Sequence, residues 1–174
     1  EVLQQVTAGQ LDFGLMADEL SVAGLEHSEF LRVPGVIAMH SRHPLAARPR
    51  ITLRDLTEHP FIALNPEDAS RRRLETALHD QGLALRPVLE TPYSNSVCEF
   101  ALHGVGIGLV HPVMALDYLA RGLTIKPLEL DIGFACLLVF RPGTPLSENA
   151  RALLKAMRIE LDRDLKRIRT ALST

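Results

Sequence analysis

The chain has 174 residues, 47% of them hydrophobic, and a formal net charge of -2. This globular composition excludes a disordered tail, and the near-neutral charge excludes a strongly basic nucleic-acid-binding domain within these residues. No uncharged stretch approaches the ~20 residues that a membrane-spanning helix needs, and the sequence opens without an apolar leader. Two cysteines cannot form a disulfide framework, so we expect a cytoplasmic protein with no membrane partner.

Hydrophobic periodicity predicts strands and helices that alternate along almost the whole chain. In chain order, we expect strands at residues 11–16, 30–40, 61–64, 85–90, 123–130 and 134–140, and a glycine-rich turn at 104–110 that leads into a strand. The expected helices lie at residues 2–8, 97–102, 113–121 and 147–174, and a further helix, capped by Asn65 or Asp68, runs to about Gln81. Such alternation through short loops is typical of an α/β fold with mostly parallel sheets and flanking helices.

Local signals refine the ends of these elements. Pro34–Gly35 predicts a bend within the second strand, because proline cannot donate to a ladder. Thr52 followed three residues later by Asp55 predicts a capping box at the start of a short helix. Gly106 and Gly108 follow a helix and enter a strand, which is the reverse of a phosphate loop, so we expect them to permit close packing.

The clearest chemical signal is the polar turn Tyr93-Ser94-Asn95-Ser96 at the start of a helix. Hydroxyls and an amide meet there with the unpaired N–H groups of a helix N-terminus, an arrangement that binds anions. We therefore predict that these residues hold the carboxylate of a ligand. Capping of the helix by Ser94 or Ser96 alone is the alternative, and the two roles can coexist.

A second polar turn covers residues 65–68 and also leads from a strand into a helix. Asn65, Glu67 and Asp68 supply acceptors suited to an ammonium or guanidinium group, and capping is again the alternative. In α/β folds ligands sit where strand ends meet helix N-termini, so both turns are candidate ligand contacts.

Other residues fit structural roles better. His40 and His43 lack a nearby cysteine or carboxylate, so surface or capping roles are favoured over a metal site. The run from Arg71 to Arg73 is typical of a solvated helix face, with an Arg71 that points back toward the ligand cleft as the less favoured alternative. No spacing suggests a catalytic triad or a cofactor site, so we expect neither enzymatic activity nor a cofactor.

Five segments resemble, in order and spacing, those of the effector-binding domain of LysR-type transcriptional regulators. They are residues 8–15, 43–46, 51–56, 105–112 and 145–147. The resemblance implies the two-lobed fold of type 2 periplasmic binding proteins, with lobe one at 1–31 and 133–174 and lobe two at 32–132. It also implies a small effector in the cleft between the lobes, and His111, in the fourth segment, joins the candidate contacts.

The resemblance carries further expectations about the whole protein. A winged helix-turn-helix outside this chain would bind DNA, the first strand of lobe one would be missing here, and the regulator would be a homodimer or homotetramer. Residues 90–98 and 114–118 look like those of regulators that respond to lysine and to opines, which points to an amino-acid-like effector.

Two other functions stay open on the sequence. One is a periplasmic solute-binding protein for amino acids. The other is a prephenate-dehydratase-like enzyme, although Thr91-Pro92-Tyr93 lacks the arginine of the Thr-Arg-Phe motif of that family.

Overall fold

The computed structural model describes residues 1–18, 21–22 and 24–173. The chain forms two compact units, one of Glu1–Val33 with Phe134–Arg163 and the other of Pro34–Gly133 with Asp164–Thr174. The lobe boundaries given above stay a prediction. None of the helices in the described residues is long and apolar enough to cross a membrane.

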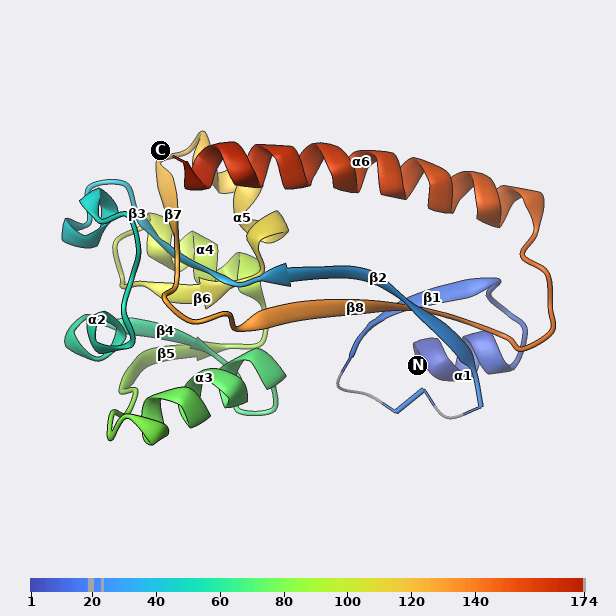
Figure 1. The fold of residues 1–174 in the computed structure, drawn as a ribbon, viewed down its shortest axis with the longest axis horizontal. Helices are drawn as coiled ribbons and strands as arrows, with labels where there is room; N and C mark the ends of the chain where they lie inside the picture. The colour runs from blue at the N-terminus through green and yellow to red at the C-terminus, as the bar shows by residue number, and fades with distance from the viewer. Residues whose placement is uncertain (19–20, 23, 174) are drawn as a thin grey trace. The chain divides into compact units, whose positions relative to one another are not determined.

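The first unit contains a three-stranded sheet in the order β1-β8-β2 (Figure 1). Its elements are α1 (Val2–Thr7), β1 (Phe13–Ala17), β2 (Glu26–Pro34), β8 (Gly133–Phe140) and the first part of α6 (Glu148–Leu172). Strands β1 and β8 are antiparallel, and Val6, Met16, Leu25 and Val139 form a buried cluster. The apolar face of the short helix α1 therefore has its partners within this unit.

The second unit holds the remaining strands and most of the helices (Figure 1). Its strands are β3 (Val36–His40), β4 (Phe61–Leu64), β5 (Pro87–Thr91), β6 (Gly108–Val110) and β7 (Leu123–Pro127). Its helices are the 3-10 helix η1 (Pro44–Ala47), α2 (Leu53–Glu58), α3 (Ala69–Asp80), α4 (Ser94–Leu102), α5 (Pro112–Leu119) and the end of α6. Gly35 separates β2 from β3, so the predicted extended segment is interrupted at Pro34–Gly35, as expected.

Strand order explains why the expectation of mostly parallel sheets is wrong. Among the described residues, β4 pairs with β5 in parallel, but β3 pairs with both β6 and β7 in antiparallel fashion, as β1 does with β8. Only β4 and β5 are neighbours joined through a single helix, α3, and such a crossover makes a pair parallel. The other neighbours are distant in sequence, so the alternation of strands and helices does not determine their direction.

Close packing between β4, β6 and α4 makes the centre of the second unit. All four residues of β4 are buried, and Ile62 N–H donates to Ile107 O at 2.8 Å, which connects β4 to the residue before β6. A Cβ on Gly108 would lie 2.6 Å from Ile62 O and closer still to Val97 Cγ1. Gly108 therefore permits close packing, as predicted.

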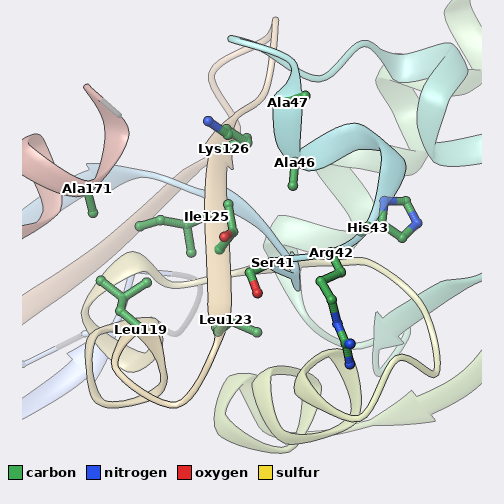
Figure 2. A pocket seen from close by; sticks show the side chains of 11 residues that line it. Ser41, Arg42, His43, Ala46, Ala47, Leu119, Leu123, Ile125, Lys126 and Ala171 are labelled. Carbon is green, nitrogen blue, oxygen red and sulfur yellow. The ribbon is translucent and has the colours of Figure 1, made fainter.

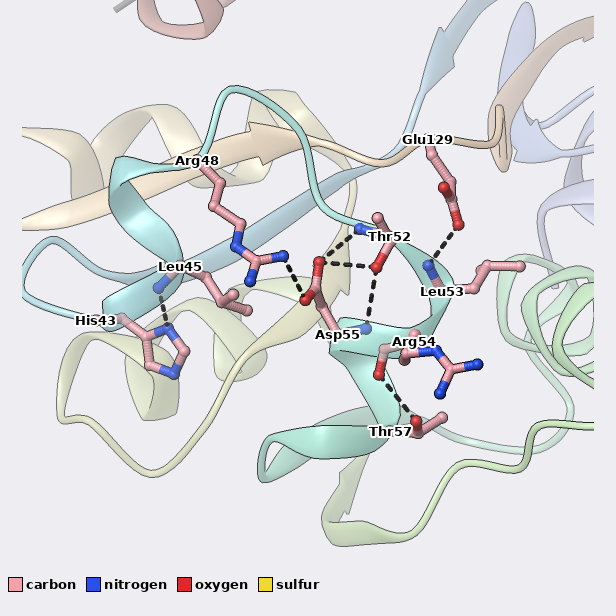
Figure 3. A network of polar contacts seen from close by, with 9 residues as sticks. All are labelled: His43, Leu45, Arg48, Thr52, Leu53, Arg54, Asp55, Thr57 and Glu129. Carbon is pink, nitrogen blue, oxygen red and sulfur yellow. Dashed lines mark hydrogen bonds and ion pairs between the residues drawn. The ribbon is translucent and has the colours of Figure 1, made fainter.

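A capping box starts α2, as predicted (Figure 3). The carboxylate of Asp55 accepts hydrogen bonds from Thr52 N–H and Oγ1, each at 2.8 Å, and Arg48 Nη1 donates to it at 2.8 Å. Burial opposes ionisation, but the hydrogen bonds from Thr52 and the charge of Arg48 hold the pKa of Asp55 below its usual value.

Two more contacts fix the loop before α2 (Figure 3). His43 Nδ1 accepts from Leu45 N–H at 3.2 Å and so caps η1, which confirms the capping interpretation of His43. Glu129 Oε1 accepts from Leu53 N–H at 2.7 Å across 76 residues of sequence. The long connection from β3 to α2 is therefore anchored at both ends.

Candidate functional site

Three strand-to-helix turns meet at one edge of the second unit. Strands β4 and β5 are parallel with Leu64 opposite Thr91, so the turns that follow them, into α3 and α4, lie side by side. A parallel bridge joins Phe61 to Ile107, which orients β6 like β4 and puts His111, at the start of α5, at the same edge. Helix N-termini gathered at the carboxyl ends of strands are the usual ligand position in α/β folds.

Helix α4 begins without a side-chain cap. Tyr93 occupies the N-cap position and makes no capping hydrogen bond, whereas Ser94 Oγ accepts from His111 N–H at 3.4 Å. Asn95 Oδ1 accepts from Ser96 N–H at 2.9 Å. The alternative that Ser94 or Ser96 caps the helix is therefore wrong, because the Ser94 hydroxyl bonds to the neighbouring turn instead.

The predicted residues of this turn differ in exposure and surroundings. Ser94 and Ser96 are half-buried, and Tyr93 is 65% exposed. Asn95 is exposed and lines a hollow of about 380 Å³ together with residues of α5 and α6, among them Asp117. The structure thus brings Ser94 and His111 together, whereas Asn95 lines the hollow next to α5 and α6.

The turn between β4 and α3 is held by Asp68. Its Oδ1 accepts from Arg71 N–H at 3.1 Å and from Ser70 Oγ at 2.5 Å, so Asp68 is the N-cap of α3. Asp68 N–H donates to Asn65 O at 3.0 Å, which closes the turn. Both Asn65 and Asp68 are half-buried at the edge where β4 ends.

Arg71 lies in the first turn of α3, and its interpretation as part of a solvated face is wrong. Its side chain is only 10% exposed, and Nη1 donates to Leu64 O and to Glu90 Oε1, each at 2.6 Å. Nε donates to Glu75 Oε1 at 2.9 Å. Burial opposes the charge, but the two carboxylates raise the pKa of Arg71 above its usual value.

The spacing of the sequence allows the contact of Arg71 with Glu75 but does not indicate its contact with Glu90. Arg71 and Glu75 are four residues apart on a helix, a spacing that pairs opposite charges. Glu90 comes from β5, so its contact depends on the pairing of β4 with β5. Arg71 thereby links the carboxyl ends of two neighbouring strands under the candidate site.

His111 is a neutral cap at this edge. Its Nδ1 accepts from Val113 N–H at 3.3 Å at the start of α5. Burial lowers the pKa of His111 to about 4. At neutral pH the imidazole is therefore uncharged, and a ligand at this edge meets a dipole at this position rather than a cation.

Acidification is expected to destabilise the fold through His111. The unfolded chain takes up the proton near pH 6.5 and the folded chain only near pH 4, so stability present at pH 7 is lost as the pH falls through this window. From pH 7 to pH 5 the loss attributable to His111 is about 2 kcal/mol, measured by urea unfolding. H111N keeps a capping oxygen but cannot titrate, and should remove this part of the pH dependence.

The exposed His79 on α3 offers the matched control. H79N should leave the pH dependence of the free energy of unfolding as in the wild type. An unchanged slope in H111N would contradict the buried neutral state.

Comparison with known proteins identifies the family. The model of the LysR substrate binding domain matches residues 1–162. The Transcriptional activator protein LysR of Escherichia coli (strain K12) is 30% identical over 167 residues, which cover 96% of this chain and 52% of that protein. The Regulatory protein NocR of Agrobacterium tumefaciens (strain T37) is 23% identical over 161 residues, or 90% of this chain and 54% of that protein. The chain spans about half the length of these curated relatives.

Solved structures share the fold. HinK, a LysR family transcriptional regulator from Pseudomonas aeruginosa, superposes with a TM-score of 0.75 at 19% identity, over 92% of this chain and 56% of that chain. The C-terminal domain of a probable LysR family regulator from Rhodococcus sp. RHA1 gives 0.66 at 25% identity, over 87% and 76%. These matches confirm the predicted type 2 periplasmic-binding-protein-like fold.

The relatives favour a regulatory role over both alternatives, since they are named as transcriptional regulators and not as solute carriers or dehydratases. The chain belongs to the family of LysR substrate-binding domains, the ligand-binding regulatory domains of LysR-type transcriptional regulators.

Proposed function

We propose that this chain senses a small amino-acid-like effector at the edge formed by the turns after β4, β5 and β6. The observation that carries the proposal is the start of α4, which lacks a side-chain cap while the hydroxyl of Ser94 reaches the turn of His111. A ligand carboxylate fits there, because the N–H groups that open a helix have no carbonyl partner within it and favour an anion. Of these groups at the described start of α4, only the N–H of Ser96 bonds to a side chain, at Asn95 Oδ1. Ser94 and Ser96 add hydroxyl donors without adding charge.

The other end of the ligand meets the turn after β4. Asn65 and Asp68 supply oxygen acceptors for an ammonium group, and the exposed Tyr93 belongs to the neighbouring turn, which follows β5. The neutral imidazole of His111 adds no positive charge that would repel the ammonium. The resemblance of residues 90–98 and 114–118 to regulators that respond to lysine and to opines guides our choice of the first ligands.

Effector binding would act by shifting a conformational equilibrium of the domain, with no bond made or broken. The effect would reach DNA through a winged helix-turn-helix outside these residues, in a homodimer or homotetramer in the cytoplasm. The lobes in this proposal are residues 1–31 with 133–174 and residues 32–132. Linkage then requires DNA binding and effector binding to influence each other equally.

A thermal-unfolding panel of lysine, arginine, octopine and nopaline tests the site. A ligand at ~100 times its Kd should stabilise the wild type by ~2.7 kcal/mol, which is several degrees in Tm. The double variant S94A/S96A removes both hydroxyls and should weaken binding about tenfold or more, because a carboxylate loses charge-assisted hydrogen bonds. Isothermal titration calorimetry measures that change directly.

S28A, on the exposed strand β2, is the matched control and should bind as the wild type does. Equal affinity of S94A/S96A and wild type for a ligand that stabilises both would show that the carboxylate lies elsewhere.

A further inference from the structure

A pocket of about 520 Å³ lies in the second unit, away from the three turns described above. The outer strand β7 runs along it, and the residues that follow β3, together with η1, line another side (Figure 2). Ala171 of α6 and Leu119 of α5 complete the lining. This volume is within the range of pockets that hold small organic ligands.

The charged side chains that line this pocket are positive. Lys126 of β7 is only 7% exposed, and Arg42 follows β3; among the described residues that line the pocket, no side chain is a carboxylate. The ion pairs found in residues 1–18, 21–22 and 24–173 involve other cations. The 7% exposure of Lys126 is that of the whole residue, and its Nζ is not among the buried side-chain atoms without a hydrogen bond in the described residues. The stem of Lys126 is therefore buried while its ammonium group is accessible to an anion.

The other polar side chains that line the pocket are uncharged and can form hydrogen bonds with a ligand. Ser41 and Thr124 contribute hydroxyls. His43 already accepts from Leu45 N–H through Nδ1, and burial, with the nearby His59, lowers its pKa, so its ring is neutral. The positive charge of the pocket therefore comes from Lys126 and Arg42.

The remaining lining is apolar and small. Ala46 and Ala47 of η1 contribute methyl groups, as does Ala171, and Leu119 and Leu123 add larger aliphatic surface (Figure 2). A bare inorganic ion would leave this surface uncovered, whereas an anion with a compact apolar body would bury it. The lining thus favours an organic anion.

We propose that this pocket is a second ligand site, which takes a small organic anion whose charged group lies at Lys126 and whose apolar body contacts the methyl groups of Ala46 and Ala47. Arg42 lies at the other end of the lining and points away from Lys126 (Figure 2), so it attracts the anion without contacting the charged group. The charged group is a carboxylate or a phosphate monoester. The site shares no residue with the turns at Ser94, Asp68 and His111.

Methyl NMR of the protein labelled at alanine tests the proposal, because Ala46, Ala47 and Ala171 report on the pocket directly. Benzoate and phenyl phosphate are the probes, since they share an apolar body and differ in the charged group. We expect saturable shifts of these three methyl resonances with at least one probe, and the tighter of the two identifies the charged group. No saturable shift of these methyl groups with either probe would overturn the site.

Variants separate a specific site from surface attraction. K126M keeps length and removes the charge, and should weaken the better probe about tenfold. R42Q removes the exposed cation at the other end of the lining (Figure 2) and should weaken the probe by less, about twofold. K155M, on the exposed face of α6, should bind as the wild type does.

R42Q changes an exposed residue and keeps the test informative if K126M fails to fold. Wild-type affinity in a folded K126M would refute the contact at Lys126, and wild-type affinity in R42Q would refute the attraction by Arg42. S94A/S96A should leave these shifts unchanged, which distinguishes this site from the proposed effector site.

Discussion

Replacing Gly108 with alanine is expected to lower the free energy of unfolding by about 3 kcal/mol or more. The new methyl group would overlap Val97 Cγ1 and lie 2.6 Å from Ile62 O. The carbonyl of Ile62 belongs to β4, whose four residues are all buried, so it cannot move aside without disturbing the centre of the second unit. Urea unfolding followed by circular dichroism measures the change.

G82A provides the control for the backbone alone. Gly82 has a φ of 69°, and a Cβ there meets nothing within 4 Å, so alanine is disfavoured only by its conformation, at about 1–2 kcal/mol. We expect G108A to be clearly less stable than G82A. Equal losses in the two variants would mean that β4 and α4 can separate to admit a methyl group.

The variant R71M is expected to lower the free energy of unfolding by about 2–3 kcal/mol. It leaves Leu64 O, Glu75 and Glu90 without the guanidinium that they share. The side chains of the two glutamates are 43% and 47% exposed, so water screens them and the loss stays below that of a fully buried pair.

The neighbouring Arg72 is exposed and donates to Glu67 O, so R72M is the matched control and should change the stability by no more than about 0.5 kcal/mol. Because Arg71 links the ends of β4 and β5, R71M should also weaken binding of an effector at the adjacent turns. A stable R71M protein would show that the pairing of β4 with β5 holds these ends without the guanidinium.

Local patterns predicted the elements well. The capping box at Thr52 and Asp55, the cap of α3 at Asp68 and the break after Pro34 all follow from side chains within a few residues of one another. On α6, the apolar residues that recur every three or four positions are half-buried or buried as well; they are Ala150, Leu154, Met157, Leu161, Leu165, Ile168 and Leu172. Short-range physics is enough for such features.

Features that depend on tertiary pairing were not predictable in the same way. The direction of β3 against β6 and β7 depends on strand neighbours 70 or more positions apart, and the burial of Arg71 depends on Glu90 from another strand. Ser94 would cap α4 by local rules, yet its hydroxyl bonds to His111 N–H, 17 residues along the chain.

The same reasoning applies to the candidate sites. Two polar turns could be found because each is continuous in sequence, and parallel β4 and β5 bring them together. The pocket at Lys126 is assembled from four separate segments, so no local pattern marks it. Asn95 shows the limit of a continuous motif, because it lines a hollow beside α5 while Ser94 contacts the turn of His111.

The placement of the candidate contacts in the turns after β4, β5 and β6 has a consequence for engineering. Asn65, Tyr93 and Ser94 are half-buried or exposed, whereas the strands that end beside them are buried or paired. Substitutions in the turns can alter which metabolite is recognised while the strands keep the scaffold intact. A biosensor library restricted to these turns would therefore retain a high fraction of folded members, and selection could act on recognition alone.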